Sequence, residues 1–271
     1  MGRRDVRSSE WLSFAYFGLL IALAWMRPLP AIRRLQIAAI GLPMCGAILW
    51  MARNAGTSVR DWAPAAIILV GYYLSGRFFV QPSQTLERRL AEWDRRLLGD
   101  PAPSFARWPR PLLAFLEVVY MGCFLLVPAG FAALALTGRA AQADRYWTLV
   151  VGAEFGAFAP LSFVQTRPPW ALERTAAPPR GVDGAVHRLA SRAVRDFTIN
   201  ANTFPSGHVA GSLAVAFALL GPMPWVGAIV LLLAASISVA CVVGRYHYVV
   251  DALAGGALAL VIWGIVNAAG L

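Results

Sequence analysis

Residues 203–256 read TFPSGHVAGSLAVAFALLGPMPWVGAIVLLLAASISVACVVGRYHYVVDALAGG, and the rest of the chain is organised around this stretch. Two polar clusters, FPSGH at 204–208 and GRYHYVVD at 244–251, flank an apolar middle. The chain has three histidines, and two of them, His208 and His247, fall in these clusters. This coincidence is the main sequence evidence about function.

The apolar middle consists of two runs, 212–220 and 225–243, separated by Gly-Pro-Met-Pro at 221–224. Proline lacks a backbone N–H and clashes with the preceding helical turn, so it interrupts a helix. The pattern therefore predicts a helical hairpin, which returns the chain to the side it left. We expect His208 and His247 to face each other at one membrane surface.

The composition indicates an integral membrane protein. Of the 271 residues, 58% are hydrophobic and 14% are charged, and several apolar runs approach the roughly 20 residues that span a bilayer. The net charge is +10 and the chain contains no lysine. Arginine binds phosphate with two-point geometry, although the codon bias of a GC-rich genome explains the missing lysine at least as well. A basic membrane protein favours anionic headgroups, so the expected partners are the bilayer and a membrane lipid phosphate, with no nucleic acid.

The apolar runs predict an all-α fold, a polytopic transmembrane helical bundle of about eight spans. In chain order the spans are 11–26, 35–52, 63–80, 112–136, 147–164, the two runs of the hairpin, and 248–267. The first run resembles the apolar region of a signal peptide, but no small-residue cleavage site follows it, which favours a retained helix. Residues 1–10 read as a basic tail. We divide the chain into N-terminal spans with an interfacial helix, 1–111, and a catalytic transmembrane core, 112–271.

Two other segments predict amphipathic surface helices. In 84–98, four large apolar residues recur at helical spacing while charged residues occupy the other face, which is typical of a helix in the headgroup plane. A helix packed on the end of the bundle is the alternative. The prolines of 101–111 predict an irregular connection. A second surface helix is expected around 186–197, with His187 as a solvated side chain.

Two carboxylates fall within predicted spans, Glu117 in the fourth and Glu154 in the fifth. Carboxylates at membrane depth are costly and usually face the bundle interior or a water-filled cavity. Each either shapes a polar cavity beneath the active site or is a protonated or arginine-paired structural group. Cys45, Cys123 and Cys241 lie far apart in apolar runs, and their spacing predicts neither a disulfide framework nor a metal site.

The two polar clusters suit phosphoryl transfer, in which catalysis is mostly positioning and electrostatic stabilisation. One histidine can attack phosphorus while the other protonates the leaving oxygen. His247 is the better nucleophile because Asp251 follows it by four residues. If both lie on the first turns of the last helix, they share a face, and the carboxylate can hold one ring nitrogen protonated. His208 is then the general acid. For Asp251, a carboxylate favoured by the helix dipole is the alternative.

Four further residues are predicted to bind the phosphate. Arg167 and Arg245 would clamp its oxygens. Ser206 and Gly207 begin a helix, where unpaired N–H groups and the helix dipole favour an anion. No carboxylate cluster suggests Mg²⁺ or Zn²⁺, so we expect a metal-independent reaction without a cofactor.

These residues resemble the type 2 phosphatidic acid phosphatase superfamily of integral membrane lipid phosphatases and phosphotransferases. The resemblance is carried by RP at 167–168, PSGH at 205–208 and RYHYVVD at 245–251. It implies a helical bundle whose core helices carry the three motifs, with His208 as general acid and His247 as nucleophile. The expected function is a membrane enzyme that cleaves or transfers a phosphate-containing lipid headgroup through a phosphohistidine. The candidate lipids are phosphatidate, a polyprenyl diphosphate or a phospholipid.

Two departures from the common motifs concern the substrate. The family usually has a lysine where this chain has Pro160 and an arginine where it has Cys241. Arg-Pro-Pro-Trp at 167–170 and the R-Y-H-Y form look more like the inositol-phosphorylceramide-synthase-like branch, which moves a headgroup between lipids. The alternatives are a headgroup transferase of that type and a non-catalytic relative that binds lipid. A vanadate haloperoxidase-like enzyme fits less well because the chain has many spans.

Two arguments about the side of the membrane conflict. Arginines concentrate in the loops on the catalytic side, which the positive-inside rule places in the cytoplasm. The resemblance implies an extracytoplasmic active site in a bacterial inner (plasma) membrane, and we adopt that side. The sequence predicts no particular oligomeric state.

Overall fold

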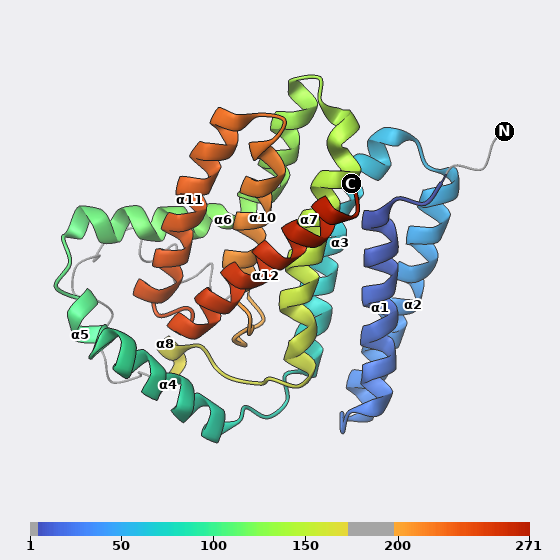
Figure 1. Ribbon diagram of the computed structural model, residues 1–271. Helices are drawn as coiled ribbons and strands as arrows, with labels where there is room; N and C mark the ends of the chain where they lie inside the picture. The colour runs from blue at the N-terminus through green and yellow to red at the C-terminus, as the bar shows by residue number, and fades with distance from the viewer. Residues whose placement is uncertain (1–4, 173–197) are drawn as a thin grey trace.

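The computed structural model describes residues 5–172 and 198–271, and every regular element in this part of the chain is a helix (Figure 1). The all-α prediction is confirmed. The surface helix predicted around 186–197, with His187, lies outside the described residues.

Eight apolar helices follow one another in the predicted order. They are α1 (Ser8–Met26), α2 (Ala31–Asn54), α3 (Thr57–Ser75), α6 (Arg110–Leu136), α7 (Ala143–Phe158), α10 (Gly207–Leu220), α11 (Pro224–Val243) and α12 (Val249–Ala268). Three short 3₁₀ turns, η1 (Gly76–Phe78), η2 (Ala140–Gln142) and η3 (Ala159–Ser162), adjoin them. The helices predicted to extend to residues 80 and 164 end earlier, at Ser75 and Phe158, and each is followed by a 3₁₀ turn.

Five of these helices, α1, α2, α6, α11 and α12, are long and apolar enough to cross a membrane. The other three are not. The 14 residues of α10 reach about 21 Å at 1.5 Å per residue, against a hydrocarbon core of about 30 Å. The 16 residues of α7 are also short, and α3 carries Arg60 and Asp61 near its start. The predicted count of eight spans is not confirmed.

The helical hairpin forms as the prolines predict. Pro224 occupies the first position of α11, where its missing N–H costs nothing. Gly227 then lets α11 approach the end of α10, because a Cβ there would lie 2.6 Å from the Leu220 backbone. Gly255 does the same for α12 and α10, since its Cβ would lie 2.6 Å from the Ser206 carbonyl oxygen.

The core lies around α7, which packs against α10 and α1, and the α1–α2 hairpin flanks it on one side (Figure 1). Helix α1 begins at Ser8 rather than after a tail of ten residues, and Glu10 is buried. Its carboxylate accepts hydrogen bonds from Nε and Nη2 of Arg60, both at 2.7 Å. This buried ion pair fastens α1 to α3.

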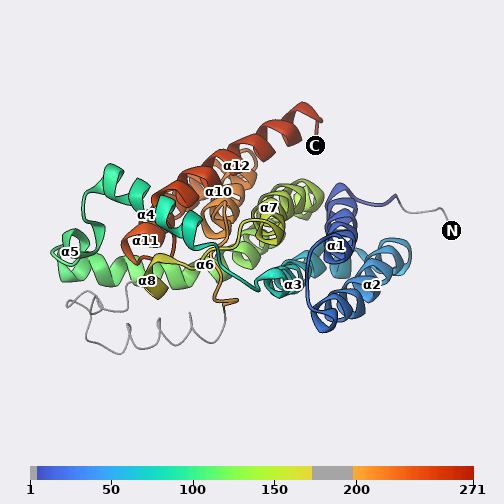
Figure 2. The same ribbon diagram turned by 90° about the horizontal axis from the view of Figure 1, so that it is seen from below.

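Three surface elements lie at the end of the bundle where α11 finishes and α12 starts: α4 (Gln84–Leu98), α5 (Pro101–Phe105) and α8 (Pro169–Leu172) (Figures 1 and 2). The bounds of α4 are those predicted, and Ser83 caps its start by accepting a hydrogen bond from the Leu86 N–H. Leu90 is buried, whereas Trp93 and Leu97 are 53% and 55% exposed. Helix α4 therefore packs on the bundle with one face and presents an apolar strip outward. Part of the segment expected to be irregular is helical, as α5.

Candidate active site

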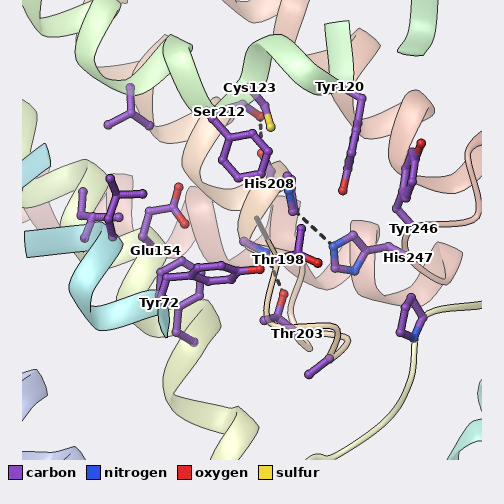
Figure 3. Close-up of a pocket in the computed structure, with 18 of the residues that line it drawn as sticks. Tyr72, Tyr120, Cys123, Glu154, Thr198, Thr203, His208, Ser212, Tyr246 and His247 are labelled. Carbon is purple, nitrogen blue, oxygen red and sulfur yellow. Dashed lines mark hydrogen bonds between the residues drawn. The ribbon is translucent and has the colours of Figure 1, made fainter. Parts of the chain in front are cut away.

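The hairpin brings the two predicted catalytic histidines together. His208 lies in the first turn of α10, and His247 lies in the loop before α12. Nε2 of His247 is 3.4 Å from Nδ1 of His208, and the rings meet edge to face (Figure 3). The prediction that the two histidines face each other is confirmed.

Asp251, in the first turn of α12, stands behind His247, which precedes the helix and so does not share a helix face with it. One oxygen, Oδ2, lies 3.5 Å from Nδ1 of His247, and the same oxygen accepts a hydrogen bond of 2.9 Å from the Tyr248 N–H. Both sequence interpretations of Asp251 therefore describe its position: it caps the start of α12 and faces the imidazole. At this distance Oδ2 faces Nδ1 without a hydrogen bond between them. A proton on Nδ1 would leave the lone pair of His247 on Nε2, toward His208.

A cavity of about 290 Å³ opens beside the histidines. The polar part of its wall includes His208, His247 and Thr203, while residues of α3 and α6 form an apolar part. Two of these apolar residues, Leu69 and Phe124, are 52% and 44% exposed. The cavity thus extends from the catalytic histidines toward an apolar outer surface between α3 and α6, where a lipid chain can enter.

Aromatic rings fix the orientation of the His208 imidazole. It stacks on Tyr120 with 5.0 Å between ring centroids, and Phe124 meets it edge-on at 5.4 Å. Tyr120 in turn stacks on Tyr246 at 3.9 Å. Sequence analysis did not assign Tyr120 to the site, because its position in an apolar run does not show which face of α6 it occupies.

The two predicted phosphate-binding arginines lie at the site but do not line the cavity. Each binds a buried carboxylate of α4. Arg167 donates to Glu87 from Nε at 2.9 Å, from Nη2 at 2.8 Å and from its backbone N–H at 2.8 Å. Arg245 donates from Nη1 to Oδ2 of Asp94 at 2.8 Å. Exposure of Glu87 and Asp94 is only 3% and 1%.

Asp94 has a second contact that ties α4 to the catalytic loop. Its Oδ1 accepts a hydrogen bond of 2.9 Å from the N–H of Val249, the first residue of α12. Glu87 and Asp94 are seven residues apart, two helical turns, so they lie on one face. That spacing was visible in the sequence, but the charged residues of α4 were expected to face solvent or headgroups.

Hydrogen bonding to Arg167 also changes the ionisation of Glu87. Burial alone raises the pKa of this carboxyl, but the hydrogen bonds and positive charge of Arg167 outweigh burial, and the pKa lies below its ordinary value. Glu87 is therefore a carboxylate at neutral pH, matched to a permanently charged guanidinium.

The remaining predicted residues, Ser206 and Gly207, differ in placement. Ser206 is fully buried, and its Oγ accepts a hydrogen bond from the Val209 N–H, so it caps α10. It does not line the cavity, and its role toward phosphate stays a prediction. Gly207 does line the cavity, and its N–H donates to Oγ1 of Thr203 at 3.4 Å.

Backbone hydrogen bonds hold these loops in register. The Trp170 N–H donates to the Arg245 carbonyl at 3.0 Å, and the Ser206 N–H donates to the Asp251 carbonyl at 3.0 Å. Arg245 adopts a left-handed φ of 58°, which turns the chain between the end of α11 and His247. The three motifs are thus joined to one another directly.

The two carboxylates predicted to lie within spans occupy different places. Glu154 lines the cavity beside the histidines, whereas Glu117 borders a separate small recess with Leu113 and Tyr246. Within residues 5–172 and 198–271, no three His, Cys, Asp or Glu side chains are grouped so as to hold a metal ion. Cys45, Cys123 and Cys241 are free thiols.

Comparison with known proteins assigns the family. A family model of the PAP2 superfamily matches residues 88–265 of the chain. The match runs from α4 into α12 and includes all three motifs. The chain belongs to the PAP2 superfamily. No curated protein and no solved structure shows significant similarity to it.

Membership in the PAP2 superfamily indicates the class of reaction and the kind of protein. Members are generally phosphatases, so the chain is expected to act as a phosphatase or phosphotransferase on lipid-like substrates. Together with the apolar helices, membership identifies an integral membrane protein.

Proposed function

We propose that this PAP2 protein cleaves or transfers the phosphate-containing headgroup of a membrane lipid through a phosphohistidine on His247. The supporting observation is the arrangement around the His247 ring, with Asp251 3.5 Å from one nitrogen and His208 3.4 Å from the other. A relative that only bound phospholipid would not need a nucleophile and an acid in contact.

The reaction takes two steps. In the first, Nε2 of His247 attacks phosphorus, the bond from phosphorus to the leaving oxygen breaks, and His208 gives that oxygen a proton. In the second, His208 removes a proton from water or an alcohol, whose oxygen attacks phosphorus and breaks the P–N bond. Asp251 keeps the Nδ1 proton in place throughout. The ring nitrogens are in direct contact, so the rings must separate to admit a phosphoryl group.

Arg167 and Arg245 are proposed to stabilise the phosphoryl oxygens, with the Gly207 backbone and Ser206 nearby. The guanidinium has five N–H donors, more than Arg167 uses on Glu87. Pairing with α4 fixes the direction of each guanidinium, as second-layer carboxylates commonly do for functional groups. No metal and no cofactor are proposed.

A headgroup transferase of the inositol-phosphorylceramide-synthase type is the second candidate. Where the common motifs have a lysine and an arginine, this chain has Pro160 and a fully buried Cys241, neither of which can bind phosphate. The Arg-Pro-Pro-Trp and R-Y-H-Y sequences also favour that branch. The acceptor would then be an alcohol rather than water.

We further propose that all eight apolar helices cross the bilayer of a bacterial inner membrane, with the active site on the extracytoplasmic side. Helices α7 and α10 are largely buried by their neighbours, which supports spans shorter than the lipid-facing ones. The bilayer and a lipid phosphate are the proposed partners, and nucleic acid is not. The division into N-terminal spans, 1–111, and a catalytic core, 112–271, stays a proposal. Helices α3 and α4 belong to the first part, yet they also contribute residues to the site.

The test is turnover by purified protein in lipid nanodiscs. It is supplied with phosphatidate, a polyprenyl diphosphate, or phosphatidylinositol with ceramide, and released phosphate is distinguished from new phospholipid. We expect turnover of at least one substrate that persists in excess chelator, falls with vanadate and disappears in His247→Ala. Activity lost in chelator and restored by Mg²⁺ would contradict the mechanism, and turnover of none by the wild type would favour a non-catalytic relative.

A further inference from the structure

Glu154 is a carboxyl group of the active-site cavity. It lies on α7 and lines the cavity together with both catalytic histidines (Figure 3). Within the described part of the chain, no hydrogen-bond donor and no arginine pairs with its carboxylate. Figure 3 shows it on the side of His208 away from His247.

The fold leaves room for this carboxylate against α10. A Cβ at Gly211 would overlap Oε1 of Glu154, and a Cβ at Gly207 would lie 3.3 Å from Oε2. The two glycines are one helical turn apart, so they form one shallow site on the helix surface. The carboxylate lies in that site, next to the residue that carries the proposed general acid.

Aromatic side chains border the same place. The Phe158 ring comes within 2.8 Å of where a Gly207 Cβ would be, and it packs on Tyr72 at 5.3 Å between centroids. Both rings line the cavity. In such an apolar place a carboxyl group is either protonated or paired with a cation, because an isolated carboxylate is costly there. Aromatic faces also attract ammonium groups.

We infer that Glu154 binds a positively charged amine of the substrate, so that the enzyme prefers phosphate esters of amino alcohols. The inference rests on the proposed function, because it places the amine relative to the phosphate. The amine can belong to a polar headgroup or to the lipid that carries the phosphate. In both cases it makes the same contacts, the Glu154 carboxylate and the faces of Phe158 and Tyr72.

The test compares matched substrates that differ only in the charge of the amine. A long-chain 2-aminoalkyl phosphate and its N-acetyl derivative represent an amine on the lipid, while phosphatidylethanolamine and its N-acetyl derivative represent one on the headgroup. We expect wild-type kcat/KM to favour the free amine by about ten-fold or more in one pair. Glu154→Gln should bring that ratio close to one. The pair that shows the effect identifies the source of the amine.

Glu117→Gln is the matched control, because it removes the charge of the other carboxylate in an apolar helix, which borders a different recess. This variant should keep the wild-type ratio of kcat/KM between the free amine and its N-acetyl derivative. A wild type without preference for the amine, or a Glu154→Gln variant that slows both members of a pair equally, would overturn the inference.

A binding measurement keeps the inference testable without turnover. A long-chain 2-amino alcohol should raise the melting temperature of the wild type more than its N-acetyl derivative does, and Glu154→Gln should abolish the difference. If no phosphate ester is turned over but this difference is present, the proposed function fails while the amine site stands. If turnover occurs but both compounds raise the melting temperature equally, only the inference of an amine site is wrong, and the proposed function stands.

Discussion

His208 and His247 have different neighbours, and this difference separates their roles. His247 has a carboxylate 3.5 Å from its ring, whereas His208 is enclosed by Tyr120 and Phe124. His208→Ala should slow cleavage of lipids with poor leaving groups by roughly 10²–10⁴-fold, the usual loss of general acid catalysis. A nitrophenyl phosphate, whose leaving group needs little protonation, should lose much less. Equal losses on both substrates, measured as kcat/KM, would contradict a general acid role.

Asp251 acts on the nucleophile, which every substrate uses. Asp251→Asn should therefore reduce turnover of lipid and nitrophenyl substrates by the same factor, up to about 10⁴-fold if the wrong tautomer of His247 results. Comparing the two kcat values of the variant with those of the wild type checks this. A loss confined to the lipid substrate would assign Asp251 to the leaving group instead.

At the scale of elements, α4 determines where the two arginines point. Glu87→Gln removes the charge that holds Arg167 in two-point geometry, and KM for a lipid phosphate should rise by about ten-fold, with a smaller change in kcat. Glu92→Gln on the exposed side of the same helix is the matched control and should leave KM unchanged. Equal KM values in Glu87→Gln and the wild type would show that α4 does not position Arg167.

The lowered pKa of Glu87 also predicts how the contribution of its ion pair to protein stability varies with pH. A carboxyl with a depressed pKa in the folded state stabilises the protein above its ordinary pKa, near 4.5, and this stabilisation is lost as the pH falls through the folded pKa. The melting temperatures of the wild type and Glu87→Gln should therefore differ by a constant amount from pH 7 down to about 4.5. Below that they should converge. A difference that grows in acid would contradict the pairing.

The elements also show how far sequence reasoning reaches. The hairpin, the bounds of α4 and the meeting of His208 with His247 follow from local signals: a proline break, a capping serine and helical periodicity. The partners of Arg167 and Arg245 do not, because they lie 80 and 151 residues away along the chain and periodicity carries no information on pairing at that range. The count of eight spans is not confirmed, because apolar runs in the sequence do not show which of the helices they form are long and apolar enough to cross a membrane.

At the scale of the whole molecule, the N-terminal hairpin is attached through a buried ion pair remote from the histidines. The side chains of Arg60 and Glu10 are 6% and 2% exposed. Glu10→Ala leaves the Arg60 guanidinium buried without its partner and should cost about 3–5 kcal/mol of stability, seen as a lower melting temperature in detergent. Turnover per folded molecule should remain normal. Glu92→Ala, at an exposed site, should change the melting temperature little.

The central claim is that the PAP2 core transfers phosphate through His247. Its most direct test is to mix the protein with ³²P-labelled lipid phosphate, quench within milliseconds while keeping the acid-labile phosphoramidate intact, and map the label by mass spectrometry. We predict a phosphohistidine at His247 that accumulates in His208→Ala supplied with a good leaving group and is absent in His247→Ala. Label on His208, or turnover without any labelled histidine, would contradict the account.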